Sequence, residues 1–486
     1  MGHFLGNLIE KCRNMTVEMK AATWYAVGNI IQKIAPWLVM IILTHYLATS
    51  EYGVYSVFMS WLEIFEIIIT LRIYSNGYVA GLVRDDENRT TYTSTMQTLS
   101  IILIFIWLFL YLIFNKIINT FTEINTPLTI VMICSFLGTV SFGLWSSRQR
   151  VDNKYKKMFF AIIVYGLIGP VVGALTVFLK LENPIFYVVI VRTIIQLLVA
   201  IPFFVSNYRG TNTFFKKSFA IDALKYNLPL LPYYLSMILL NHCDRLMIQK
   251  IDGYTDAALY SVSYSAAMII FVISGALNLS LQAWLFKELK NNGSNTNKSN
   301  LIALGTLIVA FFAVAEIVLA PELIMILGGK KYLEAIWVMP PLAISVIVMY
   351  IYQQYVNVLF YYKKTKYILF ASVFAAICNI ILNAIFIPVF GYVAGGYTSL
   401  VSYLIVMFLY YILARKLCHS NKIEMKNYFN TKLQMAILVI TFIVALSMIF
   451  VYKSGFVRYL LVLVMLLVLI FTRNKWLPIL KKGRKL

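Results

Sequence analysis

The stretch NLPLLPYYLSMILLNHCDRLMIQKIDGYTDAALYSVSYS, residues 227–265, decides the fold class of this chain. It begins as an apolar helix that contains Pro229 and Pro232, and it then carries Asp244 and Arg245. Charges inside an apolar segment that can cross a membrane are costly, so by default they mark functional positions. The stretch therefore predicts a membrane protein with ionisable groups at a functional site.

The composition of the whole chain agrees with a membrane protein. Of the 486 residues, 61% are hydrophobic and 13% are charged, whereas soluble domains carry about 25% charged residues. The net charge of +22 comes from lysines and arginines in short loops between apolar runs. This distribution is typical of membrane topology rather than of nucleic-acid binding. The five scattered cysteines indicate neither a disulfide framework nor a metal site.

The apolar segments predict the number of membrane spans. A membrane helix needs about 20 mainly apolar residues, and about fourteen segments meet this length. The last two are the shortest, so about twelve spans are the alternative. The sequence thus predicts an all-α polytopic membrane protein. The expected spans are 21–47, 54–81, 96–115, 127–147, 158–179, 184–205, 226–250, 256–282, 299–320, 334–359, 366–388, 391–413, 433–452 and 456–472.

Lysine and arginine residues concentrate in every second loop and at both ends of the chain. Arg148, Arg150, Lys363 and Lys364 belong to these loops, whereas the alternate loops are short and carry few cations. Because positive residues favour cytoplasmic loops, we expect both termini in the cytoplasm and an even number of spans. The short outer loops leave no room for an external catalytic domain.

Two similar segments indicate an internal repeat. EYGVYSV at 51–57 aligns with DAALYSV at 256–262, and each segment follows a long apolar segment. Chance similarity in an apolar chain is the alternative. Parallel repeats place a substrate site at their interface. We therefore expect an N-terminal lobe, a cytoplasmic inter-lobe loop, a C-terminal lobe, and an extra helix pair with a basic cytoplasmic tail. Their ranges are 1–205, 206–225, 226–415 and 416–486.

Three cations lie inside the apolar segments of the first lobe: Lys33, Arg72 and Arg192. Each such charge costs about 2.5–3.5 kcal/mol at the centre of a membrane helix, so several are not retained without pairing or use. The functional interpretation is a cationic cavity that accepts an anionic headgroup. The alternative is a set of structural ion pairs, in which Glu66 pairs with Arg72 or Lys33.

Four further charges are candidates for a gate or for ion coupling: Glu63, Glu66, Asp244 and Arg245. Glu63 and Glu66 are one helical turn apart and share a face. Asp244 and Arg245 fall near the outer end of their helix, where a structural salt bridge between them is the alternative.

The absence of several known motifs argues against some classes of protein. Motifs of covalent catalysis, of metal-dependent hydrolysis and of nucleotide binding do not occur in the sequence, so we expect neither an enzyme nor an ATP-driven pump. Gly166, Gly169 and Gly173 lie in one expected span and favour close helix packing over a binding site.

A set of motifs in the second half resembles the bacterial polysaccharide flippases of the Wzx type. These belong to the multidrug/oligosaccharidyl-lipid/polysaccharide (MOP) exporter superfamily. The resemblance covers most of the chain after residue 220, and it implies two six-helix lobes in a V-shaped transporter of the MATE and MurJ kind. The motifs are Leu228-Pro229-x-x-Pro232, Asp244-Arg245-x-x-Ile248, Ala320-Pro321-Glu322, Pro340-Pro341-Leu342, Asn379-Ile380-Ile381-Leu382-Asn383 and Ala394-Gly395-Gly396.

The resemblance also implies a function. Members of the family flip undecaprenyl-diphosphate-linked oligosaccharide repeat units, for the O-antigen of lipopolysaccharide or for capsule, to the outer leaflet of the bacterial inner membrane. Lys33, Arg72 and Arg192 would bind the diphosphate. Aromatic and amide side chains would contact the glycan, and the candidates are Trp24, Asn29, Gln32, Asn241, Tyr264, Gln353, Gln354 and Asn357.

The sequence also allows alternative functions. A flippase of a peptidoglycan precursor (lipid II) or of a teichoic-acid precursor is the alternative function. A multidrug or cation antiporter fits less well, because the charges inside the spans lean cationic, and a glycan polymerase fits least. We expect no cofactor apart from exchange of H⁺ or Na⁺. The expected partners are the lipid-linked substrate, membrane lipids, a polysaccharide polymerase and a chain-length regulator, but no nucleic acid.

Overall fold

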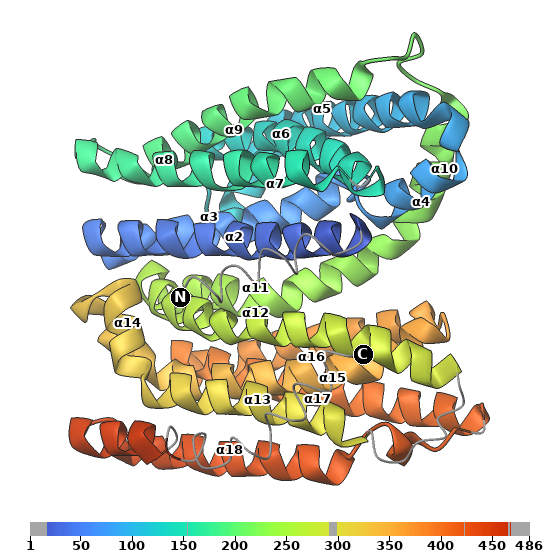
Figure 1. Ribbon diagram of the computed structural model, residues 1–486. Coiled ribbons are helices and arrows are strands. Elements are labelled where there is room, and N and C mark those ends of the chain that lie inside the picture. Colours follow the sequence, from blue (N-terminus) through green and yellow to red (C-terminus); the bar gives the residue numbers. More distant parts are fainter. Residues whose placement is uncertain (1–16, 153, 291–298, 422, 465–466, 468–486) are drawn as a thin grey trace, which may run out of the picture. The chain divides into compact units, whose positions relative to one another are not determined.

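The structure is a computed structural model that describes residues 17–464, except 153, 291–298 and 422, together with residue 467. Every regular element in these residues is a helix (Figure 1), which confirms the all-α prediction. Eleven of these helices are long and apolar enough to cross a membrane. The expected spans at 21–47 and 226–250 correspond to α2 (Val17–Tyr46) and α11 (Leu231–Asp252), which are not among the eleven.

The chain divides into two compact units, Met1–Leu235 and Ser236–Leu486, and each is described by itself. The boundary falls inside α11. The segment 206–225, expected to be a loop between lobes, contains the start of a helix, α10 (Lys217–Asn227). This helix forms because Phe219, Ala220 and Ala223 share one buried face.

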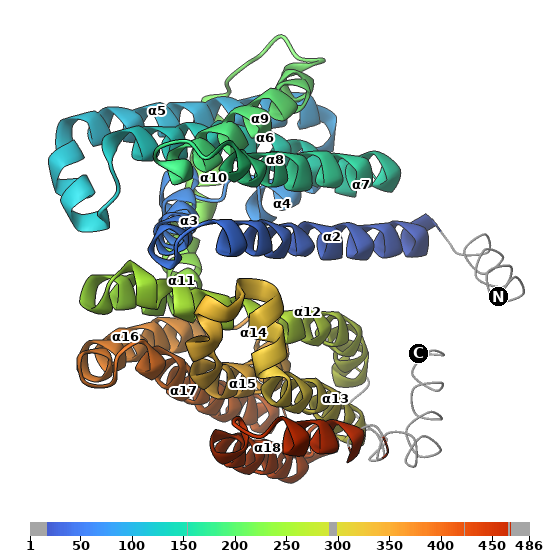
Figure 2. The same ribbon diagram turned by 90° about the vertical axis from the view of Figure 1, so that its left-hand side faces the viewer.

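Among the described residues, unit 1 contains nine complete α-helices, α2 to α10, with shorter helical segments between them. Within it α6 and α9 lie side by side (Figure 2). The elements of unit 1 are α2, α3 (Thr49–Thr70), α4 (Asn76–Arg84), η1 (Asp86–Asn88), α5 (Arg89–Thr122), α6 (Thr126–Val151), α7 (Tyr155–Ile163), the π-helical η2 (Val164–Ile168), α8 (Gly169–Leu175), η3 (Thr176–Leu179), α9 (Pro184–Tyr208), α10, η4 (Leu228–Leu230) and the first turn of α11.

The second expected span, 54–81, is not one continuous helix. It breaks after Thr70, because Leu71 and Arg72 adopt left-handed backbone angles with φ of 49° and 47°. Hydroxyl groups satisfy part of the freed backbone: Thr70 Oγ1 accepts from Arg72 N at 3.2 Å, and Ser75 Oγ donates to Arg72 O at 2.7 Å. A broken helix is tolerated in a membrane where it is buried in protein or lines a cavity.

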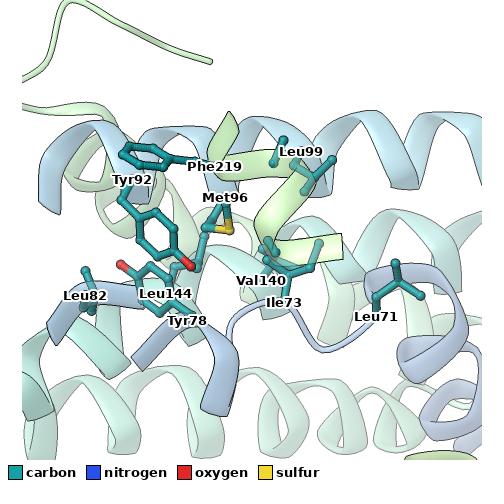
Figure 3. Close-up of a cluster of buried hydrophobic side chains, with 12 residues drawn as sticks. Leu71, Ile73, Tyr78, Leu82, Tyr92, Met96, Leu99, Val140, Leu144 and Phe219 are labelled. Atoms are coloured by element: carbon teal, nitrogen blue, oxygen red, sulfur yellow. The ribbon is translucent and has the colours of Figure 1, made fainter. Parts of the chain in front are cut away.

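A cluster of buried side chains holds this break in place (Figure 3). Tyr78 of α4 stacks on Tyr92 of α5 at 5.8 Å between ring centroids, and Phe219 of α10 meets Tyr92 edge-on at 5.3 Å. Tyr78 Oη also lies 2.7 Å from Thr93 Oγ1. The cluster therefore ties the half-helix α4 to two neighbours, which fixes the position of the residues just before it.

The glycines of the fifth expected span permit close helix packing. A Cβ on Gly173 would lie 2.7 Å from Val188 O, and a Cβ on Gly169 would lie 2.6 Å from Gln196 Cγ. Both contacts are with α9, so these glycines let α8 approach α9 closely. This confirms that they serve packing.

Unit 2 is arranged around α15 (Met339–Tyr361). Nearly every residue of this helix is buried, and it packs against α12, α13, α17 and α18, as expected of a helix that is apolar all round. The last expected span, 456–472, lies partly outside the described residues. The elements of unit 2 are the rest of α11, α12 (Tyr254–Lys290), α13 (Ser299–Val318), α14 (Ala320–Gly328), η6 (Lys330–Val338), α15, α16 (Thr365–Phe390), α17 (Tyr392–Ser420), η7 (Met425–Asn427) and α18 (Thr431–Val451).

Candidate functional site

Among the described residues of unit 2, the carboxylate of Asp244 is the most enclosed charged group, with an exposed fraction of 0%. Its Oδ2 accepts hydrogen bonds from Tyr260 Oη at 2.7 Å and from Ser399 Oγ. Its Oδ1 accepts from Asn379 Nδ2 at 3.0 Å and from Asn383 Nδ2 at 2.5 Å. Four donors from α12, α16 and α17 thus converge on one carboxylate of α11.

Local sequence explains why these groups meet. Asn379 and Asn383 are one turn apart on α16, so both amides lie on the same face of that helix. Gly395 lets α17 pack closely against α11, because a Cβ on Gly395 would lie 2.9 Å from Ile248 Cδ1 of α11. Thr398, on the next turn of α17, donates to Asn383 Oδ1 and orients that amide.

Asp244 is not paired with Arg245. Consecutive helical residues point about 100° apart, and the guanidinium of Arg245 instead lies 5.7 Å from the ring centroid of Tyr264. Within the described residues Asp244 takes part in no ion pair closer than 4 Å, so the alternative interpretation, a structural salt bridge with Arg245, is wrong. A buried carboxylate held only by neutral donors can bind a cation or a proton, which would balance its charge.

Two of the expected glycan-contact residues, Asn241 and Tyr264, contact each other, and Asn241 lies one helical turn before Asp244. Asn241 Oδ1 accepts from Tyr264 Oη at 3.3 Å and from Tyr403 Oη at 3.0 Å. Asn241 Nδ2 donates to Met237 O at 3.0 Å. This arrangement holds the amide of Asn241 between α12 and α17.

Gln354 and Asn357, also expected to contact a glycan, lie in a buried amide network with α12. Gln354 Nε2 and Asn357 Nδ2 both donate to Asn278 Oδ1, at 3.0 and 2.9 Å. Gln282 Nε2 donates to Asn357 Oδ1 at 2.9 Å. These bonds fasten α15 to α12, while the neighbouring Gln353 is part-exposed.

In unit 1, Glu66 and Arg72 flank the break in the second span. Glu66 Oε1 accepts a hydrogen bond from Tyr74 Oη, and the guanidinium of Arg72 lies 5.5 Å from the ring centroid of Tyr234. Among the described residues neither Glu66 nor Arg72 has an ion pair within 4 Å, so the alternative interpretation, a Glu66–Arg72 ion pair, is wrong as well. Glu63 is part-buried on the same helix.

Arg192 projects from α9 towards α3. Its Nη1 lies 3.5 Å from Tyr55 Oη and 2.5 Å from Met59 Sδ. Tyr165 lies within electrostatic reach of both Arg192 and Glu66, which places these two expected site residues in one region of unit 1.

The remaining expected site residues lie on α2. Lys33 and Gln32 are exposed, and Gln32 Cγ lies 3.4 Å from the position of a Cβ on Gly166. Trp24 meets Phe159 of α7 edge-on at 4.7 Å. The side chain of Asn29 is outside the described part of the chain.

Several residues around these charges were not singled out from the sequence as site residues. They are Tyr74 beside Glu66, and Tyr260, Ser399, Asn379 and Asn383 around Asp244. The spacing of the two asparagines in NIILN was a usable signal, because one helical turn places both amides on one face. The tyrosines and Ser399 carried no comparable signal, since such residues are common in membrane helices.

A family profile and two bacterial relatives match the chain. The profile of the family described as "Polysaccharide biosynthesis protein" matches residues 19–286. An "Uncharacterized membrane protein" of Haemophilus influenzae is 22% identical over 73% of this chain and 87% of its own length. The "Lsg locus putative protein 1" of the same organism is 25% identical over 74% of this chain and 88% of its own length.

Solved structures show the same fold. A lipid II flippase MurJ in an inward closed conformation matches with a TM-score of 0.67 and 14% identity, over 94% of this chain and 99% of that chain. A MATE family multidrug resistance transporter of the MOP superfamily, in an outward-facing conformation, matches with a TM-score of 0.57 and 12% identity, over 84% and 96% of the two chains. These matches confirm the expected all-α fold of the MATE and MurJ kind.

The family profile covers mainly the first half of the chain, where the sequence contains few motifs of the family. The motifs that resemble the polysaccharide flippases lie mainly after residue 220. The two lines of evidence agree on the same branch. The chain therefore belongs to the polysaccharide biosynthesis protein family.

Proposed function

We propose that this protein flips lipid-linked oligosaccharides from the cytoplasmic to the outer leaflet of a bacterial inner membrane, with both termini in the cytoplasm. The substrate is an undecaprenyl-diphosphate-linked repeat unit for O-antigen or capsule. The observation that carries the proposal is a profile match to a polysaccharide biosynthesis family in a chain with a transporter fold. A polysaccharide polymerase and its chain-length regulator would then use the flipped unit.

The cations of unit 1 support a diphosphate-binding role. Arg72 and Arg192 take part in no ion pair within 4 Å among the described residues, and both are only part-buried. An arginine offers five N–H donors in a fixed fork that suits phosphate oxygens. Lys33, exposed on α2, is the third proposed contact. The inside-negative membrane potential favours outward movement of an anion by about 2.3 kcal/mol per charge per 100 mV.

The test is a flipping assay in proteoliposomes with a fluorescent undecaprenyl-diphosphate oligosaccharide. Label that has reached the outer leaflet is measured by its reaction with a membrane-impermeant quencher. We expect Arg72→Gln and Arg192→Gln to slow flipping by at least about tenfold, because each removes a charged hydrogen bond. Arg84→Gln is the matched control, since Arg84 is 59% exposed and pairs with Asp85. Normal flipping in both site variants would contradict the proposed cationic site.

The same assay separates the alternative substrates. Lipid II, a teichoic-acid precursor and a cationic drug are offered in place of the oligosaccharide lipid. Faster transport of any of these would reassign the substrate. In cells, loss of surface polysaccharide on deletion of the gene is expected, and an intact polysaccharide layer would contradict the proposal.

We further propose that flipping is coupled to a cation bound at Asp244. The carboxylate of Asp244 and the hydroxyl oxygens of Ser399 and Tyr260 would hold it. The amide oxygens of Asn379 and Asn383 would join them after rotation of both amides, because in the structure their Nδ2 atoms face the carboxylate. Oxygen donors of this kind suit a hard cation such as Na⁺, and the carboxylate alone could instead take a proton. The bound cation would supply the charge that balances this buried carboxylate.

Two measurements test the coupling. Sodium at constant ionic strength should raise the melting temperature of the wild-type protein, because a ligand that binds only the folded state stabilises it. Asp244→Asn should abolish this rise, whereas Asp222→Asn, at an exposed aspartate of α10, should not. If sodium has no effect but a pH gradient drives flipping only with Asp244 intact, the cation is a proton. Uncoupled flipping in the wild type would contradict the proposal.

A further inference from the structure

A hollow of about 440 Å³ opens at one end of unit 2, where α16 begins and α17 ends. Lys364 and Tyr367 line it from the start of α16, and Lys416, Leu417 and Ser420 line it from the end of α17. The two helices pack along one another. The hollow is therefore a notch between the ends of two neighbouring helices.

The lining of this notch is positively charged. It contains Lys364 and Lys416 and no acidic residue. Neither lysine takes part in an ion pair within 4 Å among the described residues, and both are exposed. Lys363, Lys366 and Arg415 adjoin them in the sequence. The notch is therefore suited to an anion, and its cations are not neutralised by neighbouring carboxylates.

We expect the notch to lie at a boundary between membrane and water. Both α16 and α17 are long and apolar enough to cross a membrane, and the notch is at their ends. Tyr362 and Tyr367 on its wall are amphipathic side chains of the kind enriched at the headgroup level. The lysine-rich loops predict that this is the cytoplasmic side, where anionic lipids give the membrane a negative surface potential.

An apolar stripe leads away from the notch along α16. Tyr367, Phe370 and Phe374 follow one another at helical spacing on one face, with exposed fractions of 41%, 64% and 44%. The rings of Phe370 and Phe374 stack at 6.3 Å between centroids. A ligand with a charged head and an apolar tail could therefore use the lysines and the stripe together, whereas a soluble anion would use only the lysines.

We propose that this notch binds the phosphate headgroup of an anionic membrane phospholipid, with an acyl chain along the Tyr367–Phe374 stripe. Basic pockets between membrane helices on the cytoplasmic side bind such headgroups. The proposal does not rest on the proposed flippase function, because it concerns a lipid of the surrounding membrane and not the transported substrate.

The test uses the purified full-length protein in a neutral detergent. Lipid binding is measured by native mass spectrometry in titrations with phosphatidylglycerol and with phosphatidylethanolamine of the same acyl chains. We expect tighter binding of phosphatidylglycerol. The double variant Lys364→Ala/Lys416→Ala should weaken it by about 10- to 30-fold, since each surface cation contributes about 1 kcal/mol.

The matched control is Lys287→Ala/Lys290→Ala, which removes the same charge from exposed lysines at the end of α12. It should leave phosphatidylglycerol binding within about twofold of the wild-type value. Phe370→Ala should weaken binding of the lipid, and inorganic phosphate should not displace it. Equal loss in both double variants, equal binding of the two lipids, or displacement by inorganic phosphate would each overturn the assignment. Melting temperatures of all variants verify that they are folded.

Discussion

The phenolic oxygen of Tyr260 donates a 2.7 Å hydrogen bond to Oδ2 of Asp244, which joins α12 to α11 inside unit 2. Tyr260 is the tyrosine of the repeated segment at 256–262. Its counterpart in the first copy, Tyr55, lies 3.5 Å from the Nη1 atom of Arg192. In each copy of the segment a tyrosine hydroxyl therefore lies beside a charged group. This group is a carboxylate in unit 2 and a guanidinium in unit 1.

Loss of the Tyr260 hydroxyl should destabilise the protein. Tyr260→Phe leaves a fully buried carboxylate with one donor fewer, which should cost about 1–3 kcal/mol of unfolding free energy. The measurement is the melting temperature in detergent. Tyr350→Phe is the control, because the hydroxyl of Tyr350 is buried without a hydrogen-bond partner among the described residues. Equal stability of the two variants would show that the bond to Asp244 contributes nothing measurable.

The helices were largely predictable from the sequence. A long apolar run shows how long the membrane segment is, and its backbone must form internal hydrogen bonds in lipid, which makes it a helix. The partners of Asp244 were not predictable. Asn379 and Ser399 lie far from Asp244 in the sequence, and only the packing of α16 and α17 on α11 brings them to it. The sequence suggested Arg245 instead, since adjacency in the chain is visible and the direction of each side chain is not.

The break in the second span was also missed, for a different reason. Apolar residues lie on both sides of Arg72, Ser75, Asn76 and Gly77, so hydropathy averaged over the segment does not end the helix after Thr70. The break depends on tertiary contacts. Tyr74 packs on Gly143, where a Cβ would lie 2.6 Å from Tyr74 Cδ2, and Ser147 Oγ donates to Tyr74 O at 3.1 Å. These partners on α6 stabilise a backbone that local preference does not favour.

The glycines of unit 1 differ in how much space they have. A Cβ on Gly173 would meet the backbone oxygen of Val188 at 2.7 Å, which cannot move without shifting α9. A Cβ on Gly166 would meet only Gln32 Cγ, at 3.4 Å, an ordinary contact. We therefore expect Gly173→Ala to destabilise the protein by about 1–3 kcal/mol through overpacking.

Gly166→Ala is the matched control, and it should keep the wild-type melting temperature or raise it slightly, because alanine is the better helix former. Since the Gly173 Cβ would also lie 2.8 Å from Arg192 Cβ, Gly173→Ala should also slow flipping by displacing Arg192. A Gly173→Ala variant as stable and as active as Gly166→Ala would refute the packing role.

Glu316 on α13 destabilises the folded protein, so replacing its carboxyl group should increase the stability. Its exposed fraction is 5%, and neither carboxyl oxygen has a hydrogen-bond partner among the described residues. A buried polar group without a partner costs about 1–3 kcal/mol. Glu316→Leu should therefore raise the melting temperature. A loss of stability would indicate that the carboxyl has a partner in the native membrane.

Glu322, at the start of α14, differs from Glu316 because its carboxylate is paired. Replacing it should therefore lower the stability of the protein. Arg458 Nη1 donates to both of its oxygens, at 2.8 and 2.7 Å, and Tyr459 Oη donates at 2.9 Å. Burial by itself would raise the pKa of Glu322, but the hydrogen bonds from Arg458 and Tyr459 outweigh it and hold the pKa below its ordinary value.

This lowered pKa fixes the sign of a pH effect. A carboxyl group with a lower pKa in the folded state contributes stability above its unfolded pKa of about 4.3. That contribution is lost as the pH falls through the lower folded pKa. Glu322→Gln should thus lower the melting temperature at neutral pH, and the difference from wild type should shrink as the pH falls towards about 3. Because Glu322 is 31% exposed, the effect should be on the order of 1 kcal/mol or less. A difference that stays constant across this range would show that the Arg458–Glu322 pair contributes through packing and not through charge.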